Sequence, residues 1–412
     1  MSGAAPLMPV DEALRRLLAA APQALETETV ALAGARGRTL AQDLAAKRTQ
    51  PPSAVSAMDG YALRAADIHH VPASLRLVGE SAAGRSFAGS VGAGEAARIF
   101  TGAPVPAGAD VVVIQENTRR AASYVEILQS ENAGRNIRRA GLDFSAGDVL
   151  LARGTRLCAR HLALAAAMNH AVLPVVRKPR VAILATGDEL VLPGAHPGPD
   201  QIVTSNSFAL AAMIEAAGGE SIDLGIARDS MASLDAAIAS ALSNNADVLI
   251  TLGGASVGDH DLVQKALVKA GMQLEFWKIA LRPGKPMLHG AIDGMRVLGL
   301  PGNPVSAIVC GLLFAVPLVR ALSGDPHAGD DPAQPALLGA DLPANDMRRD
   351  YMRARLAPGA DGLPTATPEN RQDSSMLRVL TEAACLIIRE PQAPAARKGD
   401  ACRIIDFSRF GV

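Results

Sequence analysis

The feature that most constrains the fold is an alternation of apolar, strand-length runs with helical segments between Arg180 and Leu322. The strand-like runs VAILAT, SIDLGIA, DVLITLGG and MRVLGL alternate with longer segments such as SFALAAMIEAAG, MASLDAAIASAL and DLVQKALVKAG. This order predicts strand–helix–strand units in which helices cover both faces of a mostly parallel sheet. Burial on both faces explains why the strands are continuously apolar. Gly218 and Gly271 directly follow helical runs and are predicted to end helices with positive φ.

The chain on either side of this region has a different texture. Apolar residues at helical spacing predict short helices over 11–21 and over His161–Met168. From about residue 27 to 150, short segments such as LRLVGES, DVVVIQE and YVEILQS are separated by Gly and Pro, which favours a β module. After Gly324 a Pro- and Asp-rich linker leads to YMRARLAP, ACLIIREP and ACRIIDF, where we expect a small β-barrel or sandwich.

Length, charge and cysteine content exclude several classes of protein. At about 150 residues per domain, a chain of 412 residues is expected to hold two to four domains. The formal net charge is −1, so no nucleic-acid-binding surface is expected. The N-terminus lacks a basic region followed by an apolar one, and we expect a cytoplasmic protein. Four widely spaced cysteines without a C-x-x-C pair predict neither a zinc site nor a disulfide framework.

The most apolar stretch of the chain runs from Ala307 to Val319. Pro317 is expected to break it, and it falls short of the roughly 20 residues that a bilayer requires. We therefore predict a buried helix and no membrane span.

Three of the predicted strands end in glycine-rich loops, at residues 185–190, 252–261 and 300–307. The carboxyl ends of parallel strands meet at one edge of a sheet, so these loops should form one crevice. Glycine allows backbone N–H groups to approach a phosphate, and Asn303 as N-cap with Pro304 behind it would aim the positive end of a helix at the crevice. One such loop is common in any α/β protein, but three together favour a phosphate-bearing ligand.

Cations lie close to these loops in the sequence. Lys278, Arg282 and Lys285 fall within one short segment, WKIALRPGKP, whose backbone is stiffened by Pro283 and Pro286. Cations fixed on a rigid turn suit an oxyanion or a phosphate chain. Without the neighbouring glycine loops, the same segment would be interpreted as a solvated face.

Carboxylates also follow the strand ends: Glu189, Asp229, Asp259 and Asp261. Next to phosphate-binding loops, carboxylates most simply hold Mg²⁺, which takes oxygen ligands and bridges them to phosphate. For Asp229 a role as a helix N-cap is an equally good interpretation.

The β module contains two dense motifs, SAMDGYALR (56–64) and TGAPVPAGADVVVIQEN (101–117). The first places the carboxylate of Asp59 on a tight turn, and the second presents the hydroxyl of Thr101 on a rigid, Pro-rich loop. A further segment, NIRRAGLDFSAGD, carries Arg138 and Asp143, which either form an ion pair or line a site.

Seven of these strings together resemble the MoeA-type molybdopterin molybdenumtransferases, a family related to the C-terminal part of gephyrin. SAMDGYA, TGAPVPAGAD, NIRRAGLD, ATGDEL, GGASVGDHD, RPGKP and LPGNPVSA occur in the family's order, between about Val10 and Phe407. The chain departs from the family pattern at Ala54 and Val55, where Phe-Asp is frequent, in having GGAS for GGVS, and at Arg282, where Lys is common. None of these departures removes a carboxylate or a phosphate loop.

The resemblance implies an L-shaped subunit in four parts, usually a homodimer. We expect a central three-layer α/β domain with a mostly parallel sheet at 179–323 and a small C-terminal β-barrel at 324–412. The β module, 47–142, is inserted in an N-terminal linker domain formed by 1–46 and 143–178. The resemblance also implies an active site in a cleft between the α/β domain and the β module of the partner subunit.

The site residues are carried over position by position. The family pattern implies catalytic roles for Asp59, Thr101, Glu189, Asp229, Asp261, Lys278 and Arg282, with Mg²⁺ held by Glu189, Asp229 and Asp261. The residues expected to bind the pterin nucleotide are Arg138, Asp143, Gly187, Asn206, Gly253, Gly254, Ser256, Gly258, Lys285, Pro301, Gly302, Asn303 and Pro304.

The implied reaction inserts molybdate into adenylylated molybdopterin and yields molybdenum cofactor and AMP. The pterin's own dithiolene sulfurs take up the molybdenum, so paired cysteines are not needed. Transient contact with a molybdopterin adenylyltransferase and with recipient molybdoenzymes is a further expectation. Two alternatives stay open: an adenylyltransferase, which shares the α/β domain but is typically a single short domain, and a scaffold protein, which would not need the charged site residues.

Overall fold

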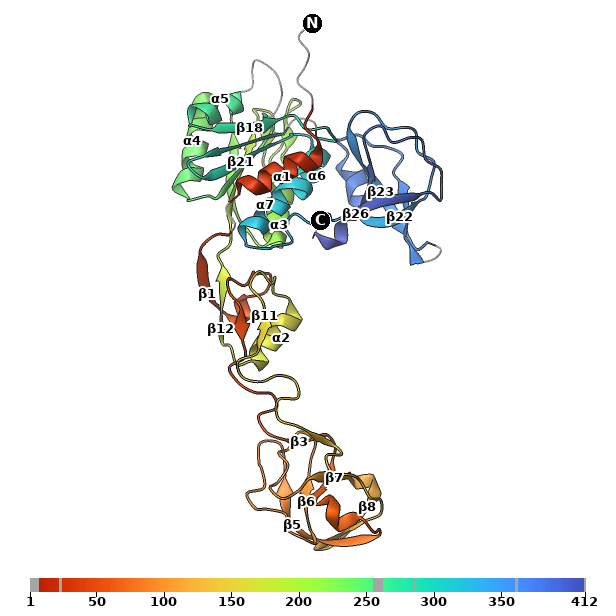
Figure 1. Ribbon diagram of the computed structural model, residues 1–412. Coiled ribbons are helices and arrows are strands. Elements are labelled where there is room, and N and C mark those ends of the chain that lie inside the picture. Colours follow the sequence, from red (N-terminus) through yellow and green to blue (C-terminus); the bar gives the residue numbers. More distant parts are fainter. Residues whose placement is uncertain (1–6, 22–23, 255–261, 285–286, 360–361, 411–412) are drawn as a thin grey trace.

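The computed structural model describes residues 7–21, 24–254, 262–284, 287–359 and 362–410. The molecule is elongated and L-shaped (Figure 1). A broad body at one end holds the α/β sheet and the C-terminal strands, a narrow stalk follows, and the β module lies at the far end (Figure 1).

The central sheet has six strands in the order β16-β13-β17-β21-β20-β18. The first four are parallel, and β20 and β18 extend the sheet in antiparallel fashion. The mostly parallel sheet is therefore confirmed, but the antiparallel pair was not predicted. Neither β18 nor β20 shows the continuous apolar run of a doubly buried strand, because QLEFW alternates and LHGAI is interrupted by His and Gly. The strands are β13 (Arg180–Thr186), β16 (Glu220–Ala227), β17 (Val248–Leu252), β18 (Gln273–Trp277), β20 (Leu288–Ile292) and β21 (Met295–Leu300).

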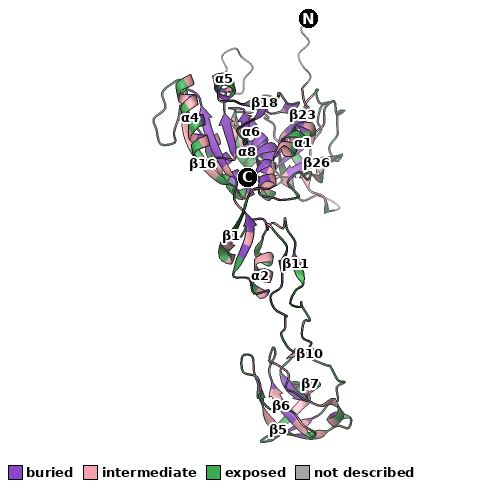
Figure 2. Cartoon of the chain, turned by 60° about the vertical axis from the view of Figure 1, so that its left-hand side comes forward, coloured by how far each residue is buried: buried purple, intermediate pink, exposed green. Residues whose placement is uncertain are grey.

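Helices bury both faces of this sheet, as Figure 2 shows by the burial of its strands. One face packs against four helices: α1 (Val10–Ala20), α3 (Asn206–Ala217), α6 (Pro304–Cys310) and α7 (Val316–Leu322). The other face packs against α4 (Met231–Ser243) and α5 (Leu262–Lys269). Successive residues of β13 divide between the two cores: Val181 and Ile183 face the first, Ala182 and Leu184 the second. Gly218 and Gly271 have φ values of 102° and 93°, as predicted for helix ends.

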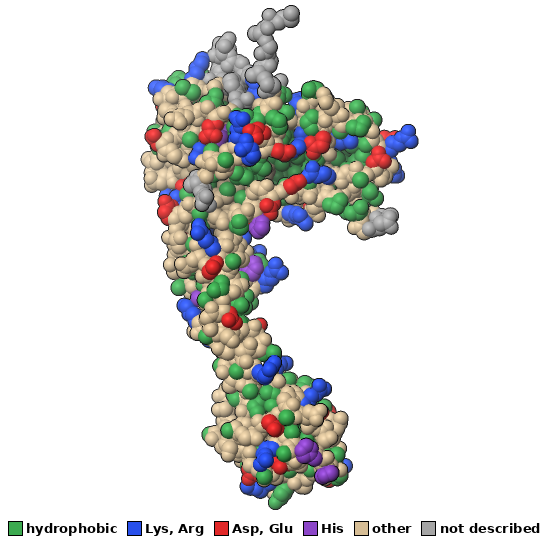
Figure 3. Space-filling model, viewed as in Figure 1, with side chains coloured by type: hydrophobic (Ala, Val, Ile, Leu, Met, Phe, Trp, Pro, Cys, Tyr) green, Lys and Arg blue, Asp and Glu red, His purple; other side chains and the backbone are tan. Residues whose placement is uncertain are grey.

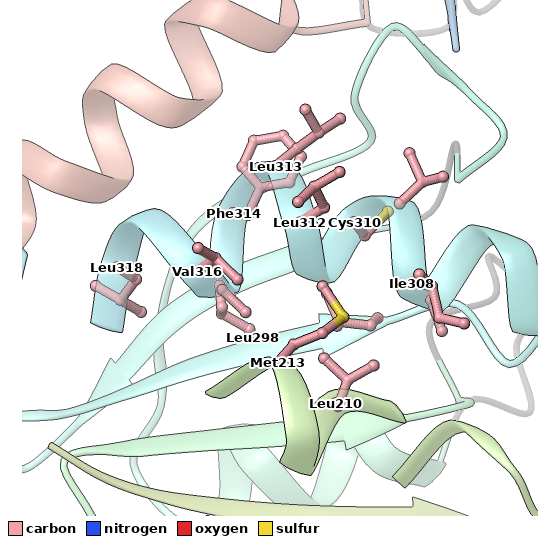
Figure 4. Close-up of a cluster of buried hydrophobic side chains, with 14 of the residues drawn as sticks. Leu210, Met213, Leu298, Ile308, Cys310, Leu312, Leu313, Phe314, Val316 and Leu318 are labelled. Carbon is pink, nitrogen blue, oxygen red and sulfur yellow. The ribbon is translucent and has the colours of Figure 1, made fainter. Parts of the chain in front are cut away.

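The prediction that Pro317 breaks the apolar stretch is wrong. The helix continues from α6 (Pro304–Cys310) through a π-helical turn (Gly311–Ala315) into α7 (Val316–Leu322). Proline lacks an N–H and clashes with the carbonyl four residues earlier, and the wider π turn accommodates it. By length and composition alone this 19-residue helix is apolar enough to cross a membrane, but 83% of its apolar window is buried inside the protein. Figure 4 shows its side chains packed on Leu210 and Met213 of α3 and on Leu298 of β21, as expected of a core helix.

The C-terminal strands form a closed barrel in the order β23-β24-β22-β26-β25, because β25 pairs back onto β23. A single two-residue strand, β19 (Leu281–Arg282), pairs in parallel with β23 and joins the α/β domain to the barrel. The expected small barrel is therefore confirmed. Its elements are β22 (Gln334–Leu338), β23 (Arg349–Ala357), β24 (Thr365–Pro368), α8 (Leu377–Glu382), β25 (Cys385–Arg389) and β26 (Ala401–Asp406).

The stalk consists of two short antiparallel pairs and one helix. β1 (Thr27–Ala31) pairs with β12 (Val172–Val176), β2 (Leu44–Ala45) pairs with β11 (Val149–Leu151), and α2 is Ala159–Ala167. The chain enters and leaves the β module through the pair β3 (Val55–Ser56) and β10 (Ile137–Arg138). The module's sheet has the order β7-β4-β6-β5-β9-β8. These strands are β4 (Gly60–Leu63), β5 (Ala73–Ser81), β6 (Glu95–Ile99), β7 (Val111–Ile114), β8 (Thr118–Ala121) and β9 (Tyr124–Ile127).

One titratable side chain is enclosed in the α/β sheet. His289 of β20 is completely buried, and neither ring nitrogen makes a hydrogen bond to the described part of the protein. Nδ1 lies 3.3 Å from Oε2 of Glu275, without hydrogen-bond geometry. Burial, reinforced by the charge of Arg296, lowers the pKa of His289 from 6.5 to about 4.

The fold therefore favours the neutral form of His289. Its contribution to the free energy of unfolding is complete above pH 6.5 and is lost as the pH falls toward 4. One pKa unit corresponds to about 1.4 kcal/mol, so this contribution is on the order of 3 kcal/mol.

We expect His289→Gln to weaken the dependence of the free energy of unfolding on pH between pH 7.5 and 4.5, measured by urea unfolding followed by circular dichroism. A matched variant of the exposed His327, His327→Gln, should behave like the wild type, and equal pH dependence in all three proteins would contradict the assignment.

Candidate active site

A cleft of about 1460 Å³ lies at the carboxyl ends of β13, β17 and β21. The glycine-rich loops that follow these strands form its floor, so the predicted meeting of the three loops is confirmed for their described residues. The start of α3 and the segment after β19 add further walls. The site residues expected from the sequence that line this cleft are Gly187, Glu189, Asn206, Asp229, Gly253, Gly254, Arg282, Pro301, Gly302, Asn303 and Pro304.

The other residues of this region that were expected in the site are not among the described lining of the cleft. Ser256, Gly258, Asp259, Asp261 and Lys285 lie outside the described residues, and their roles stay predictions. Lys278 is described, but it is not among the described residues that line the cleft.

Two glycines allow the loops to approach each other closely. Gly187 has a φ of 143°, and a Cβ at this position would lie 2.2 Å from Oε2 of Glu189. Gly253 has a φ of 100°, and its Cβ would lie 2.9 Å from the carbonyl oxygen of Thr186. A side chain at either position would displace the Glu189 carboxylate or separate two strand ends, so the shape of the floor requires glycine.

The loop after β21 leads into α6 as predicted, with Asn303 at the N-cap and Pro304 in the first turn. The Asn303 side chain makes no capping hydrogen bond. Instead, Nδ2 of Asn206 donates to the carbonyl oxygen of Gly302 at 2.7 Å, which ties the start of α3 to this loop. The N–H of Val305 donates to the carbonyl oxygen of Ser374 at 3.0 Å, so part of the helix N-terminus is covered by the C-terminal part of the chain.

Two of the three predicted metal ligands, Glu189 and Asp229, line the same cleft. The alternative interpretation of Asp229 as a helix N-cap is wrong, because Ser230 occupies that position and its Oγ accepts from the N–H of Ser233. The carboxylate of Asp229 is exposed at the cleft wall, and its own N–H donates to Oδ1 of Asp188 at 3.2 Å. Within the described ranges no group of three His, Cys, Asp or Glu residues is arranged to hold a metal ion.

Arg282 is bound on its far side by the C-terminal part of the chain. Its Nη1 contacts Oδ2 of Asp346 at 3.0 Å, and its Nη2 donates to Asn345 and to Asp350. The hydrogen bond to Asp350, with the charges of both aspartates, raises the pKa of Arg282. The guanidinium therefore stays charged and is held in a fixed orientation at the cleft wall.

A further wall of the cleft was missed by the sequence reasoning. It consists of residues from the C-terminal barrel region: Arg348, Gln372, Asp373, Ser374, Ser375 and Leu377. Nη2 of Arg348 lies 3.2 Å from Oδ2 of Asp346, so Arg282 and Arg348 share this carboxylate. The polar run RQDSS follows no glycine loop or recognisable motif, and only the folding of the barrel against the α/β domain brings it to the cleft.

The β module carries a second group of expected site residues. Oδ1 of Asp59 accepts hydrogen bonds from both the N–H and the Oγ of Thr101, each at 2.7 Å. These two bonds hold the pKa of the Asp59 carboxyl below its usual value. The structure therefore joins Asp59 and Thr101, which lie 42 positions apart in the sequence.

Arg138 and Asp143 lie close to this pair but do not bind each other. Among the described residues no ion pair within 4.0 Å joins them, so the ion-pair interpretation is wrong. Both instead line a smaller pocket of about 430 Å³, together with Arg48 and with Gly102 of the TGAPVP loop.

The two groups of residues lie at opposite ends of one subunit. Figure 1 shows β21, which ends at the cleft, in the broad body, and β6, which ends beside Thr101, in the β module at the end of the stalk. The space-filling view shows a broad concave side between the barrel and the β module (Figure 3). Within one subunit the described lining of the cleft therefore includes no residue of the β module.

Comparison with known proteins accounts for each part of this fold. Three family models match in succession: the MoeA N-terminal region (domain I and II) over 8–169, the probable molybdopterin binding domain over 182–321, and the MoeA C-terminal region (domain IV) over 335–407. Two crystal structures of the molybdopterin biosynthesis MoeA protein from Pyrococcus horikoshii each give a TM-score of 0.82, at 31% and 28% identity. They cover 98% and 97% of this chain and 99% of their own.

Curated relatives agree with the structural match. A molybdopterin molybdenumtransferase from Haemophilus influenzae is 33% identical over 405 residues, which cover 98% of this chain and 100% of the relative. One from Nostoc sp. is 40% identical over 306 residues, covering 73% of this chain and 70% of the relative. With matches over nearly its whole length and the same fold, the chain belongs to the MoeA family of molybdopterin molybdenumtransferases.

Proposed function

We propose that this chain inserts molybdate into adenylylated molybdopterin, releasing AMP and forming molybdenum cofactor. The observation that carries the proposal is the cleft in which three glycine-rich loops meet two carboxylates. Its volume of about 1460 Å³ exceeds the roughly 300–1,000 Å³ of an ordinary small-ligand pocket. That size suits a substrate in which a pterin is joined through phosphates to a nucleoside.

The phosphoanhydride of the substrate is assigned to the loops on the cleft floor. Gly253 and Gly254 lie beside the PGNP loop, and a Cβ on Gly302 would lie 3.6 Å from the Cα of Gly253. The N–H of Gly253 already donates to the carbonyl oxygen of Leu300 at 3.1 Å. In this proposal the N–H groups that reach phosphate oxygens therefore belong to the residues beside Gly253, and the start of α6 adds the positive end of its dipole. Ser256, Gly258 and Lys285 extend this binding site in the proposal.

The carboxylates fit a magnesium ion. Mg²⁺ is usually bound by one or two carboxylates together with substrate phosphates and water, and Glu189 and Asp229 supply such donors in the cleft. Asp261 is proposed as the third ligand. When bound, Mg²⁺ supplies charge neutralisation at the phosphoanhydride.

Molybdate is a substrate of the proposed reaction, and fixed cations suit its negative charge. Arg282 lies at the cleft wall with its guanidinium already oriented by Asp346 and Asp350, so binding requires little reorganisation. Lys278 is proposed as the second cation. The described cysteines are free, and Cys310 and Cys385 are buried, in keeping with metal capture by the pterin's dithiolene sulfurs.

The proposed working unit is a cytoplasmic homodimer in which the β module of one subunit completes the cleft of the other. Asp59, Thr101, Arg138 and Asp143 lie beside strands of the β module, and Glu189 lines the cleft of the body. These two parts lie at opposite ends of one subunit, which supports this arrangement (Figure 1). The division into a linker domain (1–46 and 143–178), the β module (47–142), an α/β domain (179–323) and a C-terminal domain (324–412) is part of the proposal. So are transient contacts with a molybdopterin adenylyltransferase and with recipient molybdoenzymes.

The overall reaction is tested by incubating the purified protein with adenylylated molybdopterin, Mg²⁺ and micromolar molybdate. AMP release is followed together with reconstitution of a cofactor-free molybdoenzyme. Molybdate-dependent AMP release that yields active enzyme is expected. Tight pterin binding without AMP release would favour the scaffold or the adenylyltransferase alternative.

The two carboxylates of the cleft should be required for this reaction. We expect Glu189→Gln and Asp229→Asn each to lower molybdate-dependent AMP release by about 100-fold, a loss typical of removing one charge-stabilising group. Both residues are exposed, so the variants should fold normally. Glu220→Gln, at the amino end of β16 on the opposite edge of the sheet, should keep wild-type activity. A folded Glu189→Gln protein with undiminished AMP release would show that this carboxylate plays no part.

Sharing of the site between subunits can be tested by mixing two inactive variants. In a heterodimer of Asp59→Asn with Glu189→Gln, one of the two sites would combine an intact Asp59 with an intact Glu189. After co-refolding, AMP release should recover to about a quarter of the wild-type value, because half of the dimers are mixed and each has one good site. If each site were formed within one chain, the mixture would stay inactive.

A further inference from the structure

Among the described residues, only Arg98 places its guanidinium over two aromatic rings. It belongs to β6 of the β module, and its Cζ lies 5.1 Å from the ring centroid of Tyr61 and 4.8 Å from that of Phe100. Both distances fall within the range of a favourable cation–π interaction. The side chain is only partly exposed, so these contacts are not fully screened by water.

The edge of the same guanidinium makes two hydrogen bonds. Nη1 donates to the carbonyl oxygen of Gly60 at 3.1 Å, and Nη2 donates to Oε1 of Gln115 at 2.7 Å. The N–H of Gln115 in turn donates to the carbonyl oxygen of Asp59 at 3.0 Å. Arg98 therefore connects the end of β6 with the start of β4 and the residue that follows β7.

These contacts lie directly beside Asp59 and Thr101. Asp59 precedes Gly60, which accepts from Arg98, and Thr101 follows Phe100, whose ring packs on Arg98. Both neighbours of the Asp59–Thr101 pair are thus held by one side chain. No motif in the sequence draws attention to Arg98, because its partners are brought together only by the pairing of β4 with β6 and β7.

We propose that Arg98 is a positioning residue that holds the Asp59 turn and the Thr101 loop in one fixed relative orientation. The inference rests on the proposed function in so far as Asp59 and Thr101 serve the reaction. A lysine could not replace Arg98 fully, because an ammonium lacks the planar face and the two-pronged edge that contact four residues at once.

The orientation decides what the pair can bind. Thr101 uses its one O–H hydrogen on Oδ1 of Asp59, so its remaining capacity toward a ligand is that of an acceptor. An ionised carboxylate is likewise only an acceptor. The fixed pair therefore suits a hydrogen-bond donor, such as the N–H groups of a pterin, or a cation, and not a phosphate.

The test uses the full-length protein with Arg98→Met, Arg98→Lys and, as a matched control, Arg119→Met. Arg119 lies on β8 of the same sheet in an exposed ion pair with Glu126 and touches neither loop. The first measurement is carbon-13 NMR titration of labelled aspartate, with the Asp59 signal assigned by Asp59→Asn. The second is molybdate-dependent AMP release, including the double variant Arg98→Met/Asp59→Asn.

In Arg98→Met the pKa of Asp59 should rise toward its ordinary value, because the Thr101 hydrogen bonds should loosen and because the charge of Arg98, which also lowers this pKa, is removed. Arg98→Lys keeps the charge, so a rise of the Asp59 pKa in that variant reports the loss of positioning alone. AMP release should fall by about 10- to 100-fold, the effect of misplacing a group by about 1 Å. Arg98→Lys should lie between Arg98→Met and the wild type, and Arg119→Met should match the wild type. The double variant should lose clearly less activity than the product of the two single losses, because Arg98 acts in large part through Asp59.

Unchanged Asp59 titration in Arg98→Met would overturn the proposal, and so would an additive loss in the double variant. A changed titration with full activity would support the positioning role of Arg98 and show instead that Asp59 does not serve the proposed reaction. If Arg98→Met does not fold, the same comparison is made with Arg98→Lys, whose Asp59 pKa should still rise.

Discussion

The structure depends on the burial of both faces of the three inner parallel strands β13, β17 and β21. Each of these strands divides its side chains between two hydrophobic cores, one under α3 and the Pro304–Leu322 helix and one under α4 and α5. Burial on both faces fixes the register, because a shift by one residue would exchange the two sets of side chains. The strand ends, and the loops that follow them, are therefore held in place by the two cores beneath.

The cleft is a consequence of this rigidity. Its floor contains few bulky side chains. A Cβ on Gly187 would clash with the carboxylate of Glu189, and a Cβ on Gly253 would clash with the carbonyl oxygen of Thr186. Its carboxylates lie on loops anchored to the ends of β13 and β16. The loops of a polar site of this kind contribute little to its rigidity, and the packed sheet beneath them fixes the geometry of the site.

The C-terminal barrel has a part in the site that goes beyond stabilising the body. Arg282 leaves the α/β domain and is held by Asn345, Asp346 and Asp350, and Ser374 covers the N–H of Val305. A planar guanidinium can reach three such acceptors at once, whereas an ammonium cannot hold them in the same plane. This geometry gives a physical reason for arginine rather than lysine at position 282.

The sequence alone determined the parallel sheet, the glycine loops at its edge and the residues of the cleft floor, because apolar periodicity and turn residues are local signals. It also indicated Asp59 and Thr101 through their motifs, but not that they bind each other. The wall from Arg348 to Leu377, the role of Arg98 and the continuity of the helix through Pro317 were decided by tertiary structure. The contacts of this wall and of Arg98 join residues that are far apart in the sequence, so no local pattern encodes them. The helix passes Pro317 because the backbone forms a π turn there, which the residue pattern does not indicate either. The sequence thus indicated most residues of the cleft floor and the two members of the Asp59–Thr101 pair, and packing between distant segments decided how they are oriented and what they face.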